Sequence, residues 1–280
     1  MDIGTPAIGG SAIYMPLNNQ IQDTGAGTGI AGASDQFNYT AENWTGSGTL
    51  QANVGSVANT GTNAQAGVMV RDTSAAGSEF AAVLENANGT ISLEYRSAAN
   101  SALTVDVTTA GAITPAWVKL SETQSGTTDS FTGYYSTDGT TWTQINSTPI
   151  NITFTGTTNL AGLAVTSGNA AQSQTVNFNS FSATPNNFTD QDIGGPAIAG
   201  SSTYDPTTGN WTVNGGGADI WGTSDQFNFA SQSFTGSGSI VAQVSSQTNT
   251  NVWAKAGVMF RNDSTAGQHG YRLVARNILP

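Results

Sequence analysis

The chain contains one long internal repeat. Asp2–Gly77 returns at Asp192–Gly267 with a constant offset of 190 residues and no gap, and 37 of the 76 aligned pairs are identical. Periods of about 20–50 residues are typical of solenoids that stack small units. A period of 190 residues instead predicts tandem domains, of which this chain holds one whole copy and the first part of a second.

Composition favours a folded extracellular β-protein and disfavours several classes of partner. The chain has 34 Gly, 9% charged residues and 37% hydrophobic residues, enough to build a core. A formal net charge of −11 repels phosphate backbones and anionic lipid, so neither nucleic acid nor a membrane surface is an expected partner. The absence of Cys excludes disulfides and thiolate metal sites.

The start of the chain resembles a domain boundary. Met1 is followed directly by Asp2, without a basic segment and an apolar segment of the kind that secretion leaders have, and no apolar run is long enough to cross a membrane. We therefore expect a piece of a longer extracellular or cell-surface protein, with no membrane insertion of its own.

Short alternating segments separated by turn residues predict β-strands, and no segment predicts a long helix. Gly48–Ser56 has an apolar residue at every second position, and the second copy keeps this pattern at Ile240–Val244. Asn88-Gly89 and Asp138-Gly139 are two-residue hairpin signals. The pattern predicts an all-β antiparallel sandwich or jelly roll over residues 2–185, a linker at 186–191 and a partial second copy at 192–280. A β-helix would need a short repeat, and none is visible.

An ordered series of motifs carries a family resemblance. DIGTPAIGGS and DIGGPAIAGS, GADIWGTSDQF, WAKAGVMFR, AWVKL and FTGYYSTDGTTWTQI resemble a bacterial domain family of the concanavalin A-like lectin/glucanase superfamily, in the branch described as domain of unknown function 1349-like. The resemblance covers residues 2–185 and the surviving part of the second copy. It implies a concanavalin A-like jelly roll in large secreted proteins and no uniform chemistry.

Enzymatic constellations are weak in this sequence. Glycoside hydrolysis needs two carboxylates on one face, about 5–9 Å apart, and the five Glu residues are scattered. Glu85 and Glu94, on either side of a hairpin, are the one pair that could meet, although a solvated strand face explains them better. With no Cys and a single His, a nucleophilic triad has no basis. We expect a protein that is not an enzyme and that needs no cofactor.

Aromatic residues give the best binding candidates. Trp221 and Trp253 stand where the first copy has Ala31 and Asn63. Core tryptophans replaced in this way would leave costly voids, so both are expected to be at least partly exposed. Exposed indoles suit stacking on sugar rings, and Tyr134 is a third candidate for the same surface. A Trp pair that merely covers a sheet edge is the equal alternative.

Two further sets of residues have structural interpretations. Trp117 and Trp142, in alternating strands, are expected in the core. Asp35 with Arg71, and Asp225 with Arg261, recur in both copies and predict an internal ion pair, with a sugar contact as the alternative. Calcium is conceivable from the Asp and Asn content, but no calcium-loop run occurs, so no metal site is predicted.

The sequence thus predicts a non-catalytic binding or spacer module, with carbohydrate or neighbouring copies of the same protein as partners. A structural repeat of an adhesin or filament is the alternative, and a glycoside hydrolase is less favoured. Because the strands that correspond to residues 90–185 are missing from the second copy, residues 192–280 are expected to be poorly packed or completed by another subunit.

Overall fold

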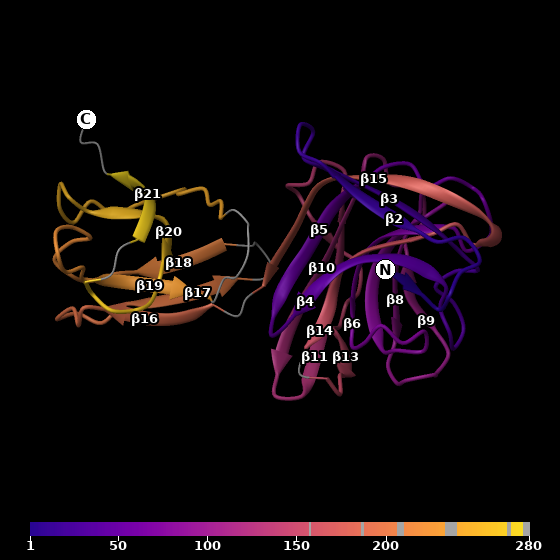
Figure 1. The fold of residues 1–280 in the computed structure, drawn as a ribbon, viewed down its shortest axis with the longest axis horizontal. Helices are drawn as coiled ribbons and strands as arrows, with labels where there is room; N and C mark the ends of the chain where they lie inside the picture. The colour runs from indigo at the N-terminus through magenta and orange to yellow at the C-terminus, as the bar shows by residue number, and fades with distance from the viewer. Residues whose placement is uncertain (157, 186–187, 206–209, 233–239, 268–269, 277–280) are drawn as a thin grey trace. The chain divides into compact units, whose positions relative to one another are not determined.

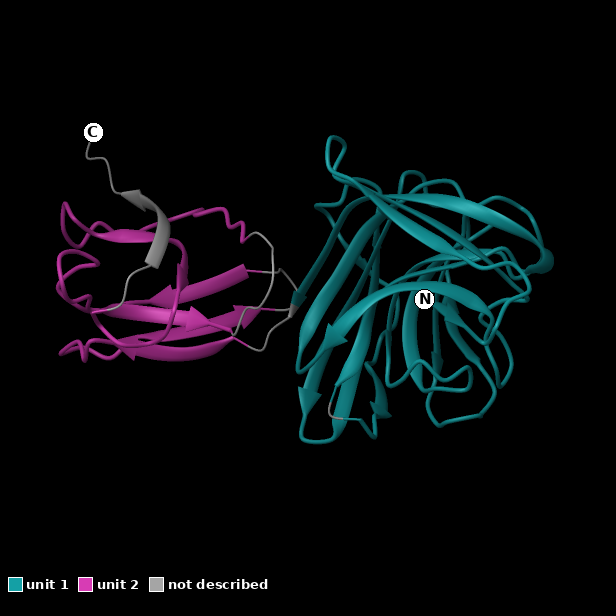
Figure 2. Ribbon diagram, viewed as in Figure 1, with its two compact units in different colours: residues 1–187 teal, residues 188–280 magenta. Residues whose placement is uncertain are grey.

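The computed structural model describes residues 1–156, 158–185, 188–205, 210–232, 240–267 and 270–276. The chain divides into two compact units, Met1–Asn187 and Phe188–Pro280 (Figure 2). All regular secondary structure among the described residues is strand, and none of these residues belongs to a helix that could span a membrane. Each unit is described by itself below.

Met1–Asn187 is built from two antiparallel sheets (Figure 1). The seven-stranded sheet has the order β1-β4-β14-β6-β7-β8-β9. Its strands are β1 (Asp2–Ile3), β4 (Phe37–Trp44), β14 (Asn159–Thr166), β6 (Gln65–Arg71), β7 (Phe80–Asn86), β8 (Ile91–Arg96) and β9 (Thr104–Thr108). Both predicted hairpins are present, and Gly89 and Gly139 have positive φ angles of 79° and 71°. Their loops are longer than the two residues expected, because β7 and β8 pair up to Glu85 and Ile91, and β11 and β12 pair from Tyr135 and Thr143.

The eight-stranded sheet has the order β12-β11-β10-β5-β15-β3-β2, and β13 also pairs with β11. Its strands are β12 (Thr143–Gln144), β11 (Thr128–Ser136), β10 (Ala116–Ser125), β5 (Gly48–Val54), β15 (Asn169–Pro185), β3 (Gln20–Gly27), β2 (Ser11–Met15) and β13 (Ile150–Thr153). The all-β jelly-roll sandwich predicted from the sequence is confirmed.

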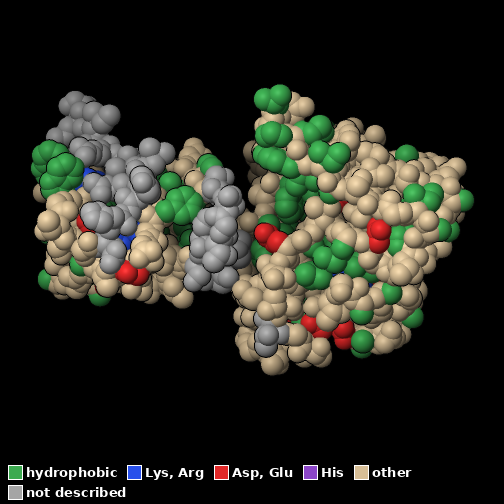
Figure 3. Space-filling model, in the orientation of Figure 1, with side chains coloured by type: hydrophobic (Ala, Val, Ile, Leu, Met, Phe, Trp, Pro, Cys, Tyr) green, Lys and Arg blue, Asp and Glu red, His purple; other side chains and the backbone are tan. Residues whose placement is uncertain are grey.

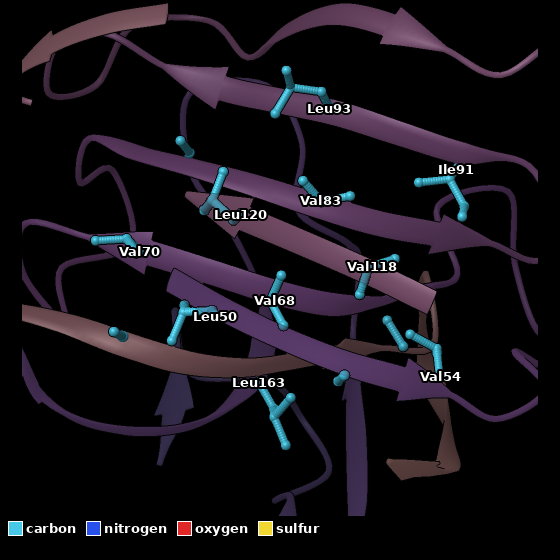
Figure 4. Packing of buried hydrophobic residues seen from close by; sticks show 14 of the residues in the cluster. Leu50, Val54, Val68, Val70, Val83, Ile91, Leu93, Val118, Leu120 and Leu163 are labelled. Atoms are coloured by element: carbon cyan, nitrogen blue, oxygen red, sulfur yellow. The ribbon is translucent and has the colours of Figure 1, made fainter. Parts of the chain in front are cut away.

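The main core fills the space between the two sheets (Figure 4). Alternation sends every second residue of a strand inward, so Leu50 from β5 meets Val68 from β6 and Val83 from β7 in one buried cluster. Burial of such aliphatic side chains contributes roughly 1.5–3 kcal/mol each. The core thus follows directly from the period-2 pattern in the sequence.

The outer face of the seven-stranded sheet is also covered, by a second apolar cluster. Phe37, Met69, Phe80 and Leu84 project from this face and are fully buried, and Ile30, from the segment between β3 and β4, packs onto them. Loops, and not a third sheet, cover this face. Polar groups hold these loops against the sheet.

Asp35 anchors those loops through two arginines. Its side chain accepts from Arg71 Nη1 at 2.9 Å and from Arg96 Nη2 at 2.7 Å, and all three side chains have no exposed surface. Both guanidinium groups also lie over the Phe80 ring, at 5.5 and 5.1 Å from its centroid. The pair of Asp35 with Arg71 had been expected from the sequence, whereas Arg96 had not been singled out.

The remaining guanidinium hydrogens bond loop carbonyls. Arg71 donates to Thr73 and Ala75, and Arg96 donates to Gly32, Ser78 and Ser101. Complete satisfaction of this kind is what makes a buried charge tolerable. One carboxylate and two arginines thereby attach three loops to one sheet face.

Phe188–Pro280 contains three two-stranded sheets among its described residues. β16 (Thr189–Ile193) pairs with β19 (Phe227–Ser231), β17 (Ser201–Asp205) with β18 (Asn210–Asn214), and β20 (Lys255–Arg261) with β21 (Gly270–Arg276). Within the described part of this unit, Ile193 is the one buried hydrophobic residue. The ion pair expected here is present, with 2.6 Å between Arg261 Nη1 and Asp225 Oδ2.

Two local expectations for the second unit were wrong. Thr189–Gln191, placed in the linker from the sequence, form the first part of β16. Ile240–Val244 have the alternation of a strand but form none. In the first unit the equivalent strand β5 pairs with β10 and β15, and the chain holds no second-copy counterpart of either partner, so alternation alone does not produce a strand.

Several carboxyl groups are buried in the first unit without a cation. Burial raises the pKa of Asp23 and Glu85 to about 7 and, with a contribution from nearby Asp129, that of Glu122 to about 9. The Trp44 indole donates to Glu122 Oε2 at 2.7 Å inside the core. Since each pKa lies above its ordinary value, folding favours the protonated form of each group.

We predict that the free energy of unfolding is highest near pH 4–5 and falls as the pH rises to 9. A carboxyl whose pKa is raised by folding stabilises fully below its unfolded pKa, and that stabilisation is lost as the pH passes through the folded value. Chemical denaturation at several pH values measures this. Glu122→Gln, which keeps an acceptor for Trp44, should flatten the decline between pH 7 and 9. Stability that increases from pH 5 to 9 would contradict the prediction.

We also predict that Asp35→Asn destabilises the first unit by about 3–5 kcal/mol, because it leaves two buried guanidinium groups without their counter-charge. Thermal and urea unfolding of the full chain measure the loss. Asp106→Asn, a matched change at an exposed position of β9, serves as the control and should leave the transition of this unit in place. Equal effects of the two substitutions would show that the ion pairs do not matter.

Candidate functional site

A pocket of about 250 Å³ opens on the outer face of the seven-stranded sheet. It lies where the apolar cluster of that face gives way to polar side chains of β6, β7, β8 and β9. One wall is apolar and the rest carries amide, hydroxyl and carboxyl groups. The lining residues are Ile30, Ala31, Thr62, Asn63, Gln65, Asn86, Ser92, Glu94, Leu103, Val105 and Thr108.

Strand alternation places the polar groups of the pocket. Gln65 in β6 and Glu94 in β8 sit at positions between inward-facing core residues, so both face outward. Gln65 Nε2 donates to Glu94 Oε1 at 2.7 Å and to Asn86 Oδ1 at 3.0 Å, and Ser92 Oγ donates to the same Glu94 oxygen at 2.6 Å. This network fixes the carboxyl group at the base of the pocket.

Two acceptor oxygens in this network have no partner. Glu94 Oε2 and Gln65 Oε1 are buried, and neither accepts a hydrogen bond in the structure. A buried acceptor left unpaired costs about 1–3 kcal/mol. Burial also raises the pKa of Glu94, against the opposing effect of its bonds from Ser92 and Gln65. Both oxygens can accept a hydrogen bond from a donor that enters the pocket.

The two acids weighed as a catalytic pair point in opposite directions. Glu85 shares the inward face of β7 with Val83, whereas Glu94 shares the outward face of β8 with Ser92 and Arg96. A sheet separates their carboxyl groups, so they do not form the pair of acids on one face that glycoside hydrolysis needs. Glu94 instead lines the pocket, a position that the sequence does not predict.

Tyr134 lies on the other sheet. It projects from the outer face of β11, with Lys119 Nζ 4.4 Å from its ring centroid, and the same ammonium lies 4.6 Å from the Trp142 ring. The structure therefore does not bring Tyr134 to the pocket. Trp142 and Trp117, expected in the core, are partly exposed on this outer face. Alternation put Trp117 on the right strand, β10, but it does not say which face of a strand is the inner one, and Trp142 lies just before β12 and not in a strand.

Trp221 and Trp253 are 66% and 60% exposed, in the second unit. Their counterparts in the first unit, Ala31 and Asn63, both line the pocket. The comparison of the two copies therefore singles out two positions that line the pocket in the first unit, although the sequence does not predict the pocket itself. Gln65, the deeper member, is also changed, to Lys255 in the second copy.

On the face shown in Figure 3, acidic side chains lie in a few separate places. No group of three or more metal-ligating side chains occurs in the part of the chain that the structure describes. Asp72, a buried acid, accepts from the backbone of Thr155 and Gly156, at 3.0 and 2.9 Å, which makes it a loop anchor.

No protein-family model matches the chain, and no curated protein matches it. Among solved structures, a functionally unknown protein from Saccharomyces cerevisiae aligns at 15% identity and TM-score 0.45, over 65% of this chain and 98% of that chain. A mutant of the GH43 protein BlXynB from Bacillus licheniformis aligns at 10% identity and TM-score 0.44, over 62% and 34%. Carbohydrate binding module CBM66 from Bacillus subtilis aligns at 13% identity and TM-score 0.39, over 65% and 96%. Likenesses of this degree do not define a function.

Proposed function

We propose that Met1–Asn187 is a non-catalytic carbohydrate-binding domain of an extracellular protein, and that its ligand enters the pocket of the seven-stranded sheet. The observation that carries this proposal is the pair of buried, unpartnered acceptors, Glu94 Oε2 and Gln65 Oε1, in a pocket of about 250 Å³. Sugar hydroxyl groups are donors that can satisfy both.

The rest of the pocket supports a sugar over other small ligands. Ile30 and Leu103 offer apolar surface to the C–H face of a ring, while Asn86 and Ser92 add donors and acceptors. A volume of about 250 Å³ lies below the usual range for drug-sized ligands, about 300–1,000 Å³, and suits a single ring at a chain end. An anionic ligand would oppose the acidic chain and the Glu94 carboxylate.

We predict that Glu94→Gln weakens sugar binding by about tenfold or more, since it replaces one of the two carboxyl oxygens by an amide donor, and a buried hydrogen bond left unmade costs about 1–3 kcal/mol. Glycan-array screening of the full chain identifies the sugar, and calorimetry then compares the variants. Glu85→Gln is the matched control, because it makes the same change on the opposite face of the same sheet and should leave affinity unchanged.

Two outcomes would contradict this function. One is that the wild-type chain binds no glycan on the array. The other is that Glu85→Gln weakens binding as much as Glu94→Gln, which would indicate a general loss of structure.

A second candidate function is that of a spacer repeat in an adhesin or filament, with neighbouring copies as partners. The internal repeat with its 190-residue period favours it. The spacer function does not need the pocket. It would be favoured if a protein that carries several copies forms extended particles and Glu94→Gln has no effect on their formation.

A further inference from the structure

We propose that the second copy carries a second glycan-binding site, formed at the positions equivalent to the pocket rim at residues 31, 62 and 63, and that Trp221 and Trp253 stack there on the ring faces of an extended neutral glycan. The inference rests on the proposed function for the location of the site. It goes further in assigning the second copy a different mode of recognition and a different class of ligand.

The two copies build the relevant turns in the same way. Ala64 N donates to Gly61 O at 3.1 Å before β6, and Ala254 N donates to Asn251 O at 2.9 Å before β20. Asn63 and Trp253 therefore occupy the same place in equivalent turns.

The second rim segment is also equivalent. Asp35 N bonds Ala76 O and Asp225 N bonds Ala266 O, each at 2.9 Å. Gly32 and Gly222, which follow Ala31 and Trp221, both have positive φ angles. Residues 190 positions apart therefore have equivalent backbone structure at the rim, in addition to similar sequence.

Every rim change makes the second copy more apolar. Ala31, Thr62 and Asn63 become Trp221, Val252 and Trp253. All three replacements are more than half exposed, Val252 at 53%. Large exposed apolar side chains at positions that line a pocket in the other copy are typical of a contact surface.

The floor of the site is changed in the opposite sense. Gln65 has an unpartnered side-chain oxygen in the first copy. The second copy has Lys255 at this position and Asp219 at the position of Gly29. Lys255 Nζ forms an ion pair with Asp219 Oδ1. The ammonium charge is thereby neutralised inside the copy, which leaves no net charge to select an ionic ligand.

These changes indicate the ligand. A narrow pocket with orphan acceptors suits one ring and its hydroxyl groups, whereas two exposed indoles suit the flat C–H faces of successive pyranose rings in a neutral chain. The two copies would then bind a terminal sugar and an internal stretch of chain, respectively.

The experiment is a fluorescence titration of the full chain with neutral linear hexasaccharides, namely cello-, xylo-, manno- and maltohexaose. Trp253→Ala and Trp221→Ala should each weaken binding of at least one of them about tenfold or more. Trp253→Phe, which keeps an aromatic face, should retain most of the affinity. Val213→Ala, an exposed apolar residue of β18, is the control and should change nothing.

The design separates this inference from the proposed function. Glu94→Gln should leave hexasaccharide binding at the second site intact, and the tryptophan variants should leave binding of the terminal sugar intact. If no hexasaccharide binds to the wild-type chain, or if the Trp→Ala variants bind as tightly as wild type, the second site does not exist even where Glu94→Gln behaves as predicted.

Folding and self-association are checked in parallel. Circular dichroism must show the same unfolding transition in each tryptophan variant. If an alanine variant fails to fold, the binding test uses the phenylalanine variant instead. Sedimentation of wild type and Trp253→Ala tests the rival occupant. A change of oligomeric state without a change in sugar affinity would mean that the indoles contact another copy of the chain, and would overturn the proposal.

Discussion

The buried carboxylate of Asp35 is the interaction on which the site depends. Its two arginines come from different strands of one sheet, and their remaining hydrogens bond carbonyls of three loops. Gly32, whose carbonyl accepts from Arg96, also accepts from the backbone of Leu103, a pocket residue. A buried charge network of this kind often adds little net stability, because desolvation offsets the attraction. Here it holds the loops that carry Ile30, Ala31 and Leu103 against the sheet.

The seven-stranded sheet serves two purposes because its faces are separated by alternation. Inward residues join the main core, and outward residues build first an apolar cluster and then a polar pocket. Loops cover the apolar part. The pocket begins where Gln65 takes the place of Met69 along β6 and Asn86 that of Leu84 along β7, and β8 adds Glu94. A rigid sheet with a polar end is a suitable support for recognition, since the base of the site does not have to be ordered when a ligand binds.

The two copies show how one scaffold can be given different binding surfaces. The anchoring elements are the same in both: an aspartate paired with an arginine, the turn before the arginine strand, and a glycine with positive φ next to the rim. The residues at the rim and floor differ, and they differ together. This separation between a preserved support and a variable surface is what the proposal of two distinct glycan sites rests on, and it places function in side chains grafted on the fold.

The sequence by itself determined the all-β class, the sandwich over residues 2–185, the hairpins at Gly89 and Gly139, and the recurring pair of aspartate and arginine. Each of these follows from local periodicity, turn chemistry or the repeat. Tertiary structure alone decided the rest. Alternation divides a strand into two faces without saying which is the core, so Trp117 was assigned to the wrong face of β10. It also does not say which strands lie close together, so the meeting of Gln65 in β6 with Glu94 in β8 could not be foreseen. Ile240–Val244 make the same point, because a strand exists only where a partner strand receives its hydrogen bonds.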